Sequence, residues 1–212
     1  MMKRFFICIA ALLASLAISF AQTPEEIIGR MDAEMAKADQ MGMTMTMDLT
    51  IPILGKVSST IKNYGEKAST EVNYKDKKEY IWMDETTTWT YDPEKNEIEI
   101  DNRKPSDSKS NDDNAEMLKG ITDGYDVTMT RETDSAWYFD CKKSKSNTKK
   151  DDPKKMSLIV AKSNYMPLDL TAKMKGVTVS IRNASIGVSE KEVTFDASSS
   201  LARQSTTSGS NV

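Results

Sequence analysis

Hydrophobic and polar residues alternate strictly over residues 41–50. The apolar positions are Met41, Met43, Met45, Met47 and Leu49, and the positions between them hold glycine, threonine and aspartate. Because side chains of a strand point alternately to opposite faces, this segment should present four thioethers and a leucine on one face. Methionine has three rotatable bonds and a polarizable sulfur, so it adapts to irregular apolar shapes. The pattern therefore predicts a soft apolar surface that binds lipid or a hydrophobic peptide.

A helical pattern precedes this strand. Thr23 is a suitable N-cap, Pro24 fits the first helical position, and two glutamates follow in the first turn, where acids oppose the helix dipole. Apolar residues then recur at helical spacing: Ile27, Ile28, Met31 and Met35. The spacing predicts one amphipathic helix over 24–39, whose apolar stripe needs a surface to cover.

Most of the remaining chain has the pattern of strands separated by short polar turns. The predicted strands are 43–53, 57–64, 67–74, 78–84, 86–91, 97–101, 125–131, 136–141, 156–162, 168–174, 177–183 and 193–195. A polar loop and a short helix near 112–120 separate the two groups of strands. Short connections favour antiparallel neighbours.

These elements predict a mainly β fold with helices (α+β). A single sheet of about a dozen strands must curl, and its concave face must be filled. The helix at 24–39 is the candidate filler. We therefore expect an unclosed antiparallel β-barrel, a half-barrel, with an amphipathic helix plugging its concave face.

The N-terminus has the pattern of a secretory signal peptide. Lys3 and Arg4 precede an apolar run over 5–18, and small residues at the usual positions predict cleavage after Ala21. The alternative, a membrane anchor, needs roughly 20 apolar residues. Cys8 lies inside the run and cannot serve as a lipoprotein cysteine. We expect a periplasmic protein whose residues 22–200 form one domain, with a flexible tail over 201–212.

Cleavage changes the chemistry of the chain. It leaves Cys141 as the single cysteine, so no intramolecular disulfide can form. Removing Lys3 and Arg4 from the 29 basic residues leaves 27 against 32 acidic residues, a net charge of −5, which argues against nucleic acid as a partner. Histidine is absent, which removes the commonest general base and metal ligand.

Three other functions have weaker support. The methionines could bind Cu(I), but same-face neighbours along a strand lie about 7 Å apart, too far for consecutive sulfurs to share one ion. An enzyme would need carboxylate pairs such as Asp84 with Glu85 or Asp92 with Glu94, which lie at predicted turns. The lysine-rich segment 142–155 is either a basic patch for anionic lipids or a solvated hairpin loop, and its two aspartates favour the loop.

Three strings resemble the periplasmic outer-membrane lipoprotein carrier family, the LolA-like proteins. They are the acidic turn, Trp-x-Tyr and acidic-proline turn over 84–98, the strand pair over 156–168, and the segment 193–196. Lys62 stands where the family typically has an arginine, and a serine-rich tail replaces its usual closing segment. The resemblance implies an unclosed barrel with a hydrophobic cavity. It also implies an inner-membrane donor complex and an outer-membrane acceptor as partners.

The resulting hypothesis is a monomeric, non-enzymatic carrier of lipoprotein acyl chains or other lipids, with no cofactor and no metal. Its cavity should be lined by the helix stripe, the methionine strand and an inward-pointing hairpin: Ile27, Ile28, Met31, Met35, Met43, Met45, Met47, Leu49, Trp89, Tyr91, Ile98 and Ile100. The alternative is a lipid sensor or cell-envelope scaffold with the same fold and no transport role.

Overall fold

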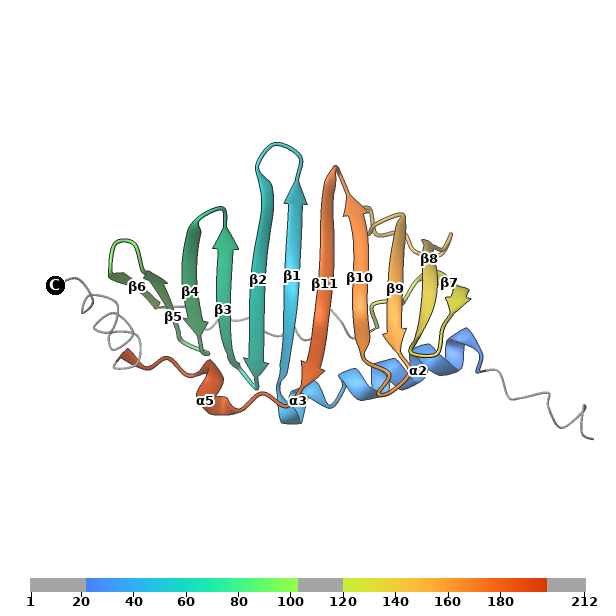
Figure 1. Ribbon diagram of the computed structural model, residues 1–212, viewed down its shortest axis with the longest axis horizontal. Coiled ribbons are helices and arrows are strands. Elements are labelled where there is room, and N and C mark those ends of the chain that lie inside the picture. The colour runs from blue at the N-terminus through green and yellow to red at the C-terminus, as the bar shows by residue number, and fades with distance from the viewer. Residues whose placement is uncertain (1–21, 103–119, 198–212) are drawn as a thin grey trace, which may run out of the picture.

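A computed structural model of the chain describes residues 22–102 and 120–197 (Figure 1). The predictions for the signal peptide, for residues 112–119 of the short helix and for the tail at 201–212 lie outside the described residues. The helices are α2 (Pro24–Met35), α3 (Ala38–Met41) and α5 (Glu190–Val193). The strands are β1 (Met43–Ile51), β2 (Gly55–Tyr64), β3 (Lys67–Tyr74), β4 (Lys77–Met83), β5 (Thr87–Asp92), β6 (Glu97–Asn102), β7 (Tyr125–Glu132), β8 (Ala136–Lys143), β9 (Lys155–Ala161), β10 (Pro167–Met174) and β11 (Val177–Ile186).

All eleven strands belong to one antiparallel sheet. Their order is β6-β5-β4-β3-β2-β1-β11-β10-β9-β8-β7, so each half is a meander and the β1–β11 pair joins the two halves. Register shifts interrupt three of the pairs, and such bulges increase the local twist and bend. Within the described strands the sheet does not close, because β6 and β7 remain its two edges. The predicted unclosed half-barrel is confirmed.

The register assigns each side chain to one of two faces. Met45 pairs with Ile61 on β2, and the same face continues through Leu158 and Phe139 in the other half. We call this the inner face, because α2 packs against it. The main hydrophobic core lies between α2 and the inner face of β1 and β8–β11. In Figure 1, α2 runs along the lower ends of β7–β10.

The predicted helix over 24–39 is divided in the structure. α2 ends at Met35, and the short α3 follows it before the chain enters β1. Gly42 makes this entry with φ +66°, and an added Cβ would lie 2.7 Å from the carbonyl oxygens of Asn63 and Val188. Only glycine fits there without strain. Met41 consequently belongs to α3, and the alternating strand begins at Met43.

The segment around α5 crosses the opposite, outer face of the sheet. Lys62 and Lys67 bind Glu192 and Glu190 at 2.8 and 2.6 Å, and the ring of Phe195 lies against the outer aromatic residues of β4 and β5. The prediction of a strand at 193–195 was wrong. Ser189 and Glu192 form a capping box that starts a helical turn.

Candidate functional site

The candidate site is the contact between α2 and the inner face. The capping box of Thr23 with Glu26 and Pro24 at the first position fix the start of α2, as the sequence predicts. Four buried residues of the helix face the sheet: Ile27, Ile28, Met31 and Met35. They meet Met43 and Met45 of β1 in one cluster. Met47 packs against the same cluster, so the structure brings together seven of the twelve predicted site residues.

Methionine is concentrated in this contact. Met31, Met35, Met43 and Met45 are each 1% exposed, and Met156 and Met166 belong to the same cluster. The side chains of α2 therefore fill the concave face over this half of the sheet. Any ligand that reaches the fully buried sulfurs must first displace α2.

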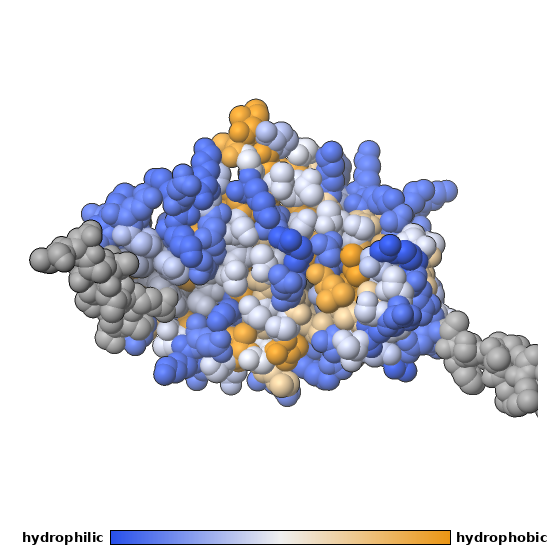
Figure 2. Space-filling model, viewed as in Figure 1, coloured by the Kyte–Doolittle hydropathy of each residue, from blue (hydrophilic) through white to orange (hydrophobic). Residues whose placement is uncertain are grey.

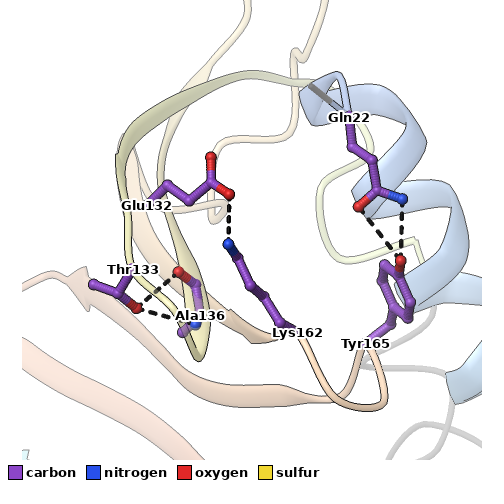
Figure 3. A network of polar contacts seen from close by, with 6 residues as sticks. All are labelled: Gln22, Glu132, Thr133, Ala136, Lys162 and Tyr165. Carbon is purple, nitrogen blue, oxygen red and sulfur yellow. Dashed lines mark hydrogen bonds and ion pairs between the residues drawn. The ribbon is translucent and has the colours of Figure 1, made fainter. Parts of the chain in front are cut away.

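Polar contacts hold the N-terminal part of α2 to the turn between β9 and β10 (Figure 3). The Tyr165 hydroxyl accepts hydrogen bonds from Gln22 Nε2 at 3.0 Å and from the Arg30 guanidinium at 2.9 Å. The Tyr165 ring stacks on Trp137, and Lys162 lies over the indole of Trp137. We call Gln22, Arg30 and Tyr165 the tyrosine latch. No local pattern in the sequence indicates this latch, because Tyr165 lies about 140 residues from its two partners.

The Asp32 carboxylate on α2 weakens the packing of this helix against the sheet. Burial raises the pKa of the Asp32 carboxyl, and the negative charge of Asp123, just before β7, raises it further. Asp32 Oδ1 is buried and accepts no hydrogen bond within the described residues. At neutral pH this helix therefore carries a negative charge that its surroundings disfavour.

The inner face continues beyond the helix. Met47 and Leu49, the next two predicted residues of β1, are only half-buried, and Val57 and Val72 continue the same face on β2 and β3. A hollow of about 180 Å³ lies at the upper end of this region, lined in part by Val72, Tyr74 and Lys77. The inner face thus runs from the fully buried core under α2 to a hollow near the β3–β4 turn, where Val72 and Tyr74 meet charged side chains.

The predicted hairpin residues lie on the other face. The inner residue Ile61 pairs with Thr70 on β3, and Thr70 pairs with Ile81 on β4. Ile81 in turn pairs with Thr90 on β5, and paired residues point to the same face. Thr88 and Thr90 are therefore on the inner face, and the prediction that the hairpin's apolar residues share a cavity with the methionines was wrong. Those residues are on the outer face: Trp89, Tyr91, Ile98 and Ile100. Phe195 stacks on Trp89 with the ring centroids 5.1 Å apart.

The carboxylates weighed as catalytic pairs stabilise turns. Asp84 accepts hydrogen bonds from the backbone N–H groups of Thr86 and Thr87, both at 2.8 Å. Burial alone would raise the pKa of Asp84, but these bonds outweigh it and lower the pKa. Asp92 accepts a bond from the Glu94 N–H at 2.9 Å. A hollow of about 380 Å³ lies beside Asp84, and Lys67 and Glu190, two of its lining residues, bind each other at 2.6 Å.

The described residues lack both a metal-binding cluster of side chains and a membrane-crossing helix. The described residues contain no group of three or more His, Cys, Asp or Glu side chains arranged to hold a metal ion. In the same part of the chain, no helix has the length and apolar character needed to cross a membrane. Cys141 is fully buried in the core, and burial raises the pKa of its thiol to about 11.

Comparisons with known proteins give similarity at the level of the fold. No family model and no curated protein matches the sequence. Among solved structures, an uncharacterized conserved protein from Thermus thermophilus is 13% identical, with a TM-score of 0.45, covering 83% of this chain and 96% of that one. A LolA superfamily protein from Nitrosomonas europaea is 13% identical, with a TM-score of 0.33 and coverage of 83% and 99%. MucB in complex with MucA(peri) is 10% identical, with a TM-score of 0.43 and coverage of 82% and 60%.

Proposed function

We propose that this protein is a periplasmic carrier that binds acyl chains of lipoproteins or other lipids between α2 and the inner face of the half-barrel. The observation that carries the proposal is the methionine-rich contact of a single helix with a concave apolar face. Thioether side chains repack around irregular apolar shapes at low cost. The site residues of this proposal are the helix stripe together with Met43, Met45, Met47 and Leu49.

The free energies of burial allow a lipid to replace α2 on the inner face. Burial of the four stripe residues is worth on the order of 6–12 kcal/mol, at about 1.5–3 kcal/mol each. An acyl chain of about sixteen methylenes gains roughly 13 kcal/mol when buried, at about 0.8 kcal/mol per methylene. One acyl chain therefore offsets the loss of the α2 contacts. A tri-acylated anchor, with some forty methylenes, would cost on the order of 30 kcal/mol to expose in water, so it needs an escort.

The carrier role assigns a place and partners to the protein. Residues 1–21 direct export and are removed, and residues 22–200 act as one monomeric domain. An inner-membrane complex supplies the lipid, and an outer-membrane acceptor receives it. The half-buried part of the inner face, at Met47 and Leu49, offers the first contact for an entering chain.

A second candidate is a lipid-sensing or scaffold module that transports nothing. The complete burial of the α2 stripe favours it, because a permanently filled concave face would serve as a core. The two candidates differ in whether α2 moves.

Bound lipid is the first test. The protein is purified from its native periplasm, and an organic extract is analysed by mass spectrometry against a mock purification. The carrier proposal predicts acylated species in a defined ratio to protein. An extract without lipid contradicts it.

Locking α2 separates the two candidates. Arg30→Cys and Tyr165→Cys are joined by a short reducible bis-maleimide, and exchange of a fluorescent fatty acid is measured before and after reduction. The Cys141 thiol does not compete, because its raised pKa keeps it protonated at neutral pH. The matched control joins Lys62→Cys to Glu192→Cys on the outer face, where the native side chains touch at 2.8 Å.

The carrier proposal predicts that the α2 lock stops exchange, that reduction restores it, and that the outer lock has no effect. Unchanged exchange in the α2-locked protein would identify the helix as a permanent plug and favour the scaffold.

A further inference from the structure

An apolar tip projects at one end of the strands, at the turn between β1 and β2. The β1–β2 turn carries Ile53, which is 96% exposed, and Leu54, which is 54% exposed. Figure 2 shows this tip as a hydrophobic cap at the top of the molecule, over the hairpin that extends furthest in Figure 1. The Tyr74 hydroxyl donates a hydrogen bond to the Leu54 carbonyl at 3.1 Å, so the exposed turn is held by β3.

The turns beside this tip are rich in lysine. The pairings of Thr50 with Thr178 and of Val57 with Tyr74 place the β10–β11 and β3–β4 turns at the same end of the strands as the β1–β2 turn. Lys175 binds Asp151 at 2.6 Å, which places the β8–β9 loop there too. We call the surface formed by these four turns, β1–β2, β3–β4, β8–β9 and β10–β11, the upper rim.

The charge of the upper rim differs from that of the chain. Residues 142–155 hold seven lysines and two aspartates, 75–78 hold three lysines and one aspartate, and 173–175 hold two lysines, whereas the whole chain has a net charge of −3. Three further rim lysines bind carboxylates: Lys77 binds Glu94 of the β5–β6 turn at 3.5 Å, Lys78 binds Glu71 at 2.7 Å, and Lys155 binds Asp140 at 2.7 Å. Even with these carboxylates counted, lysines outnumber acidic residues in the turns around the apolar tip.

We infer that the upper rim docks on the surface of an anionic lipid bilayer, with Ile53 and Leu54 inserted among the lipids and the lysines at the headgroups. A compact apolar group inserts into the interfacial region, and each nearby lysine strengthens attraction to anionic lipids by roughly fivefold. Long lysine side chains reach the headgroups while the tip is buried. This inference does not depend on the carrier role. Docking in this orientation would bring the hollow beside Val72 and Tyr74 close to the membrane.

The structure also revises the interpretation of the lysine-rich loop. Its sequence alone favours a solvated hairpin, because two aspartates dilute its charge. Asp151 is paired with Lys175 of a neighbouring turn, so the loop belongs to a larger basic surface built from segments distant in sequence.

The test is co-sedimentation with vesicles of phosphatidylcholine, with and without phosphatidylglycerol. The wild type should bind the phosphatidylglycerol vesicles, and added salt should weaken binding. Ile53→Ser with Leu54→Ser should weaken binding at least about tenfold. Lys173→Gln with Lys175→Gln should weaken it by up to roughly 25-fold, at about fivefold per lysine, and reduce its salt dependence.

Matched controls lie at the opposite end of the strands. Met41 and Leu168 are also exposed apolar residues, so Met41→Ser with Leu168→Ser should bind like the wild type. Lys37→Gln with Lys191→Gln removes two exposed charges away from the upper rim and should also leave binding unchanged. Circular dichroism and thermal unfolding verify that each variant is folded.

A second measurement follows the tip itself. An environment-sensitive dye on Leu54→Cys should shift to the blue with phosphatidylglycerol vesicles and not with phosphatidylcholine alone. The inference is overturned if the folded wild type does not bind anionic vesicles, if the tip variant binds like the wild type, or if the dye does not shift. Equal binding to both vesicle types would also overturn it. Lipid extraction from the purified protein tests the carrier role separately.

Discussion

The Asp48 carboxylate on β1 accepts a hydrogen bond from the Arg182 guanidinium on β11, across the strand pair that joins the two halves of the sheet. Asp48 is 5% exposed, and Lys56 approaches the same oxygen at 3.0 Å. Arg182 and Lys56 are themselves partly exposed, so water can solvate them if Asp48 is lost.

Replacing this carboxylate should weaken the joint between the halves. We expect Asp48→Asn to lower the free energy of unfolding by about 1–3 kcal/mol at neutral pH. Urea unfolding measures the effect. Asp151→Asn is the control, because its 86% exposed side chain should contribute less than about 0.5 kcal/mol.

The pH dependence of the same variant has a defined sign. Burial alone would raise the pKa of Asp48, but hydrogen bonds from Ser58 and Lys56 and the charge of Arg182 outweigh it and lower the pKa. The stabilisation is therefore complete above the unfolded value of 3.8 and is lost as pH falls through the lower folded value. Wild type and variant should converge in acid. A gap that stays constant down to about pH 2.5 would contradict this assignment.

The tyrosine latch should control how often α2 opens. Tyr165→Phe removes the hydroxyl bonded to Gln22 and Arg30 but keeps the ring that stacks on Trp137. Loss of about 0.5–1.5 kcal/mol should speed amide exchange in α2 by roughly two- to tenfold, measured by hydrogen exchange and mass spectrometry. Tyr138→Phe is the control, because its ring contacts Arg131 on β7. Equal exchange in α2 of both variants would exclude the latch.

Local patterns were sufficient to predict most elements. Alternation located β1 within two residues, and the N-cap and proline located the start of α2. Short turns predicted antiparallel neighbours within each group of strands, but the β1–β11 pair that joins the two groups was not predicted. These signals depend on neighbouring residues, so they can be read from one sequence.

Which face a strand presents depends on the whole sheet. A period of two shows that Trp89 and Tyr91 share a face, but the register across four strand pairs, from β1 to β5, decides which face it is. The latch between Gln22 and Tyr165 likewise arises from tertiary packing. By contrast, the capping box at Ser189 and Glu192 was visible in the sequence and could have predicted α5.

The half-buried Asp32 carboxylate of α2 should destabilise the protein at neutral pH. Because burial and Asp123 raise the pKa of Asp32, wild-type stability relative to Asp32→Asn falls as pH rises from the unfolded value of 3.8 through the higher folded value. We expect the variant to be more stable by up to about 1 kcal/mol at pH 7 and equal to wild type in acid, by thermal unfolding.

Asp123→Asn provides the coupled control for this prediction. It should stabilise in the same direction, and the double variant should gain less than the two single changes together, because the repulsion is removed only once. A stability gain of Asp32→Asn that grows as pH falls would contradict the assignment.

Glu192 should report on the contact between α5 and the sheet. Lys62 binds its carboxylate at 2.8 Å and Ser189 donates further hydrogen bonds, and together they lower the pKa of Glu192 to about 2. Lys62→Met should raise this pKa, while the bonds from Ser189 should keep it below the usual 4.5. Carboxyl chemical shifts followed by NMR during an acid titration measure it.

Lys67→Met distinguishes a specific pair from a general loss of positive charge. Lys67 binds Glu190 at 2.6 Å, so its removal should leave the pKa of Glu192 near 2. The contribution of Glu192 to holding α5 is complete above the unfolded value of 4.5 and is lost as pH falls toward 2, because its folded pKa is the lower one. The fluorescence of Trp82 and Trp89, whose rings contact Phe195, should therefore change at a higher pH in Lys62→Met than in Lys67→Met. Identical transitions in the two variants would show that the Lys62 pair does not hold α5.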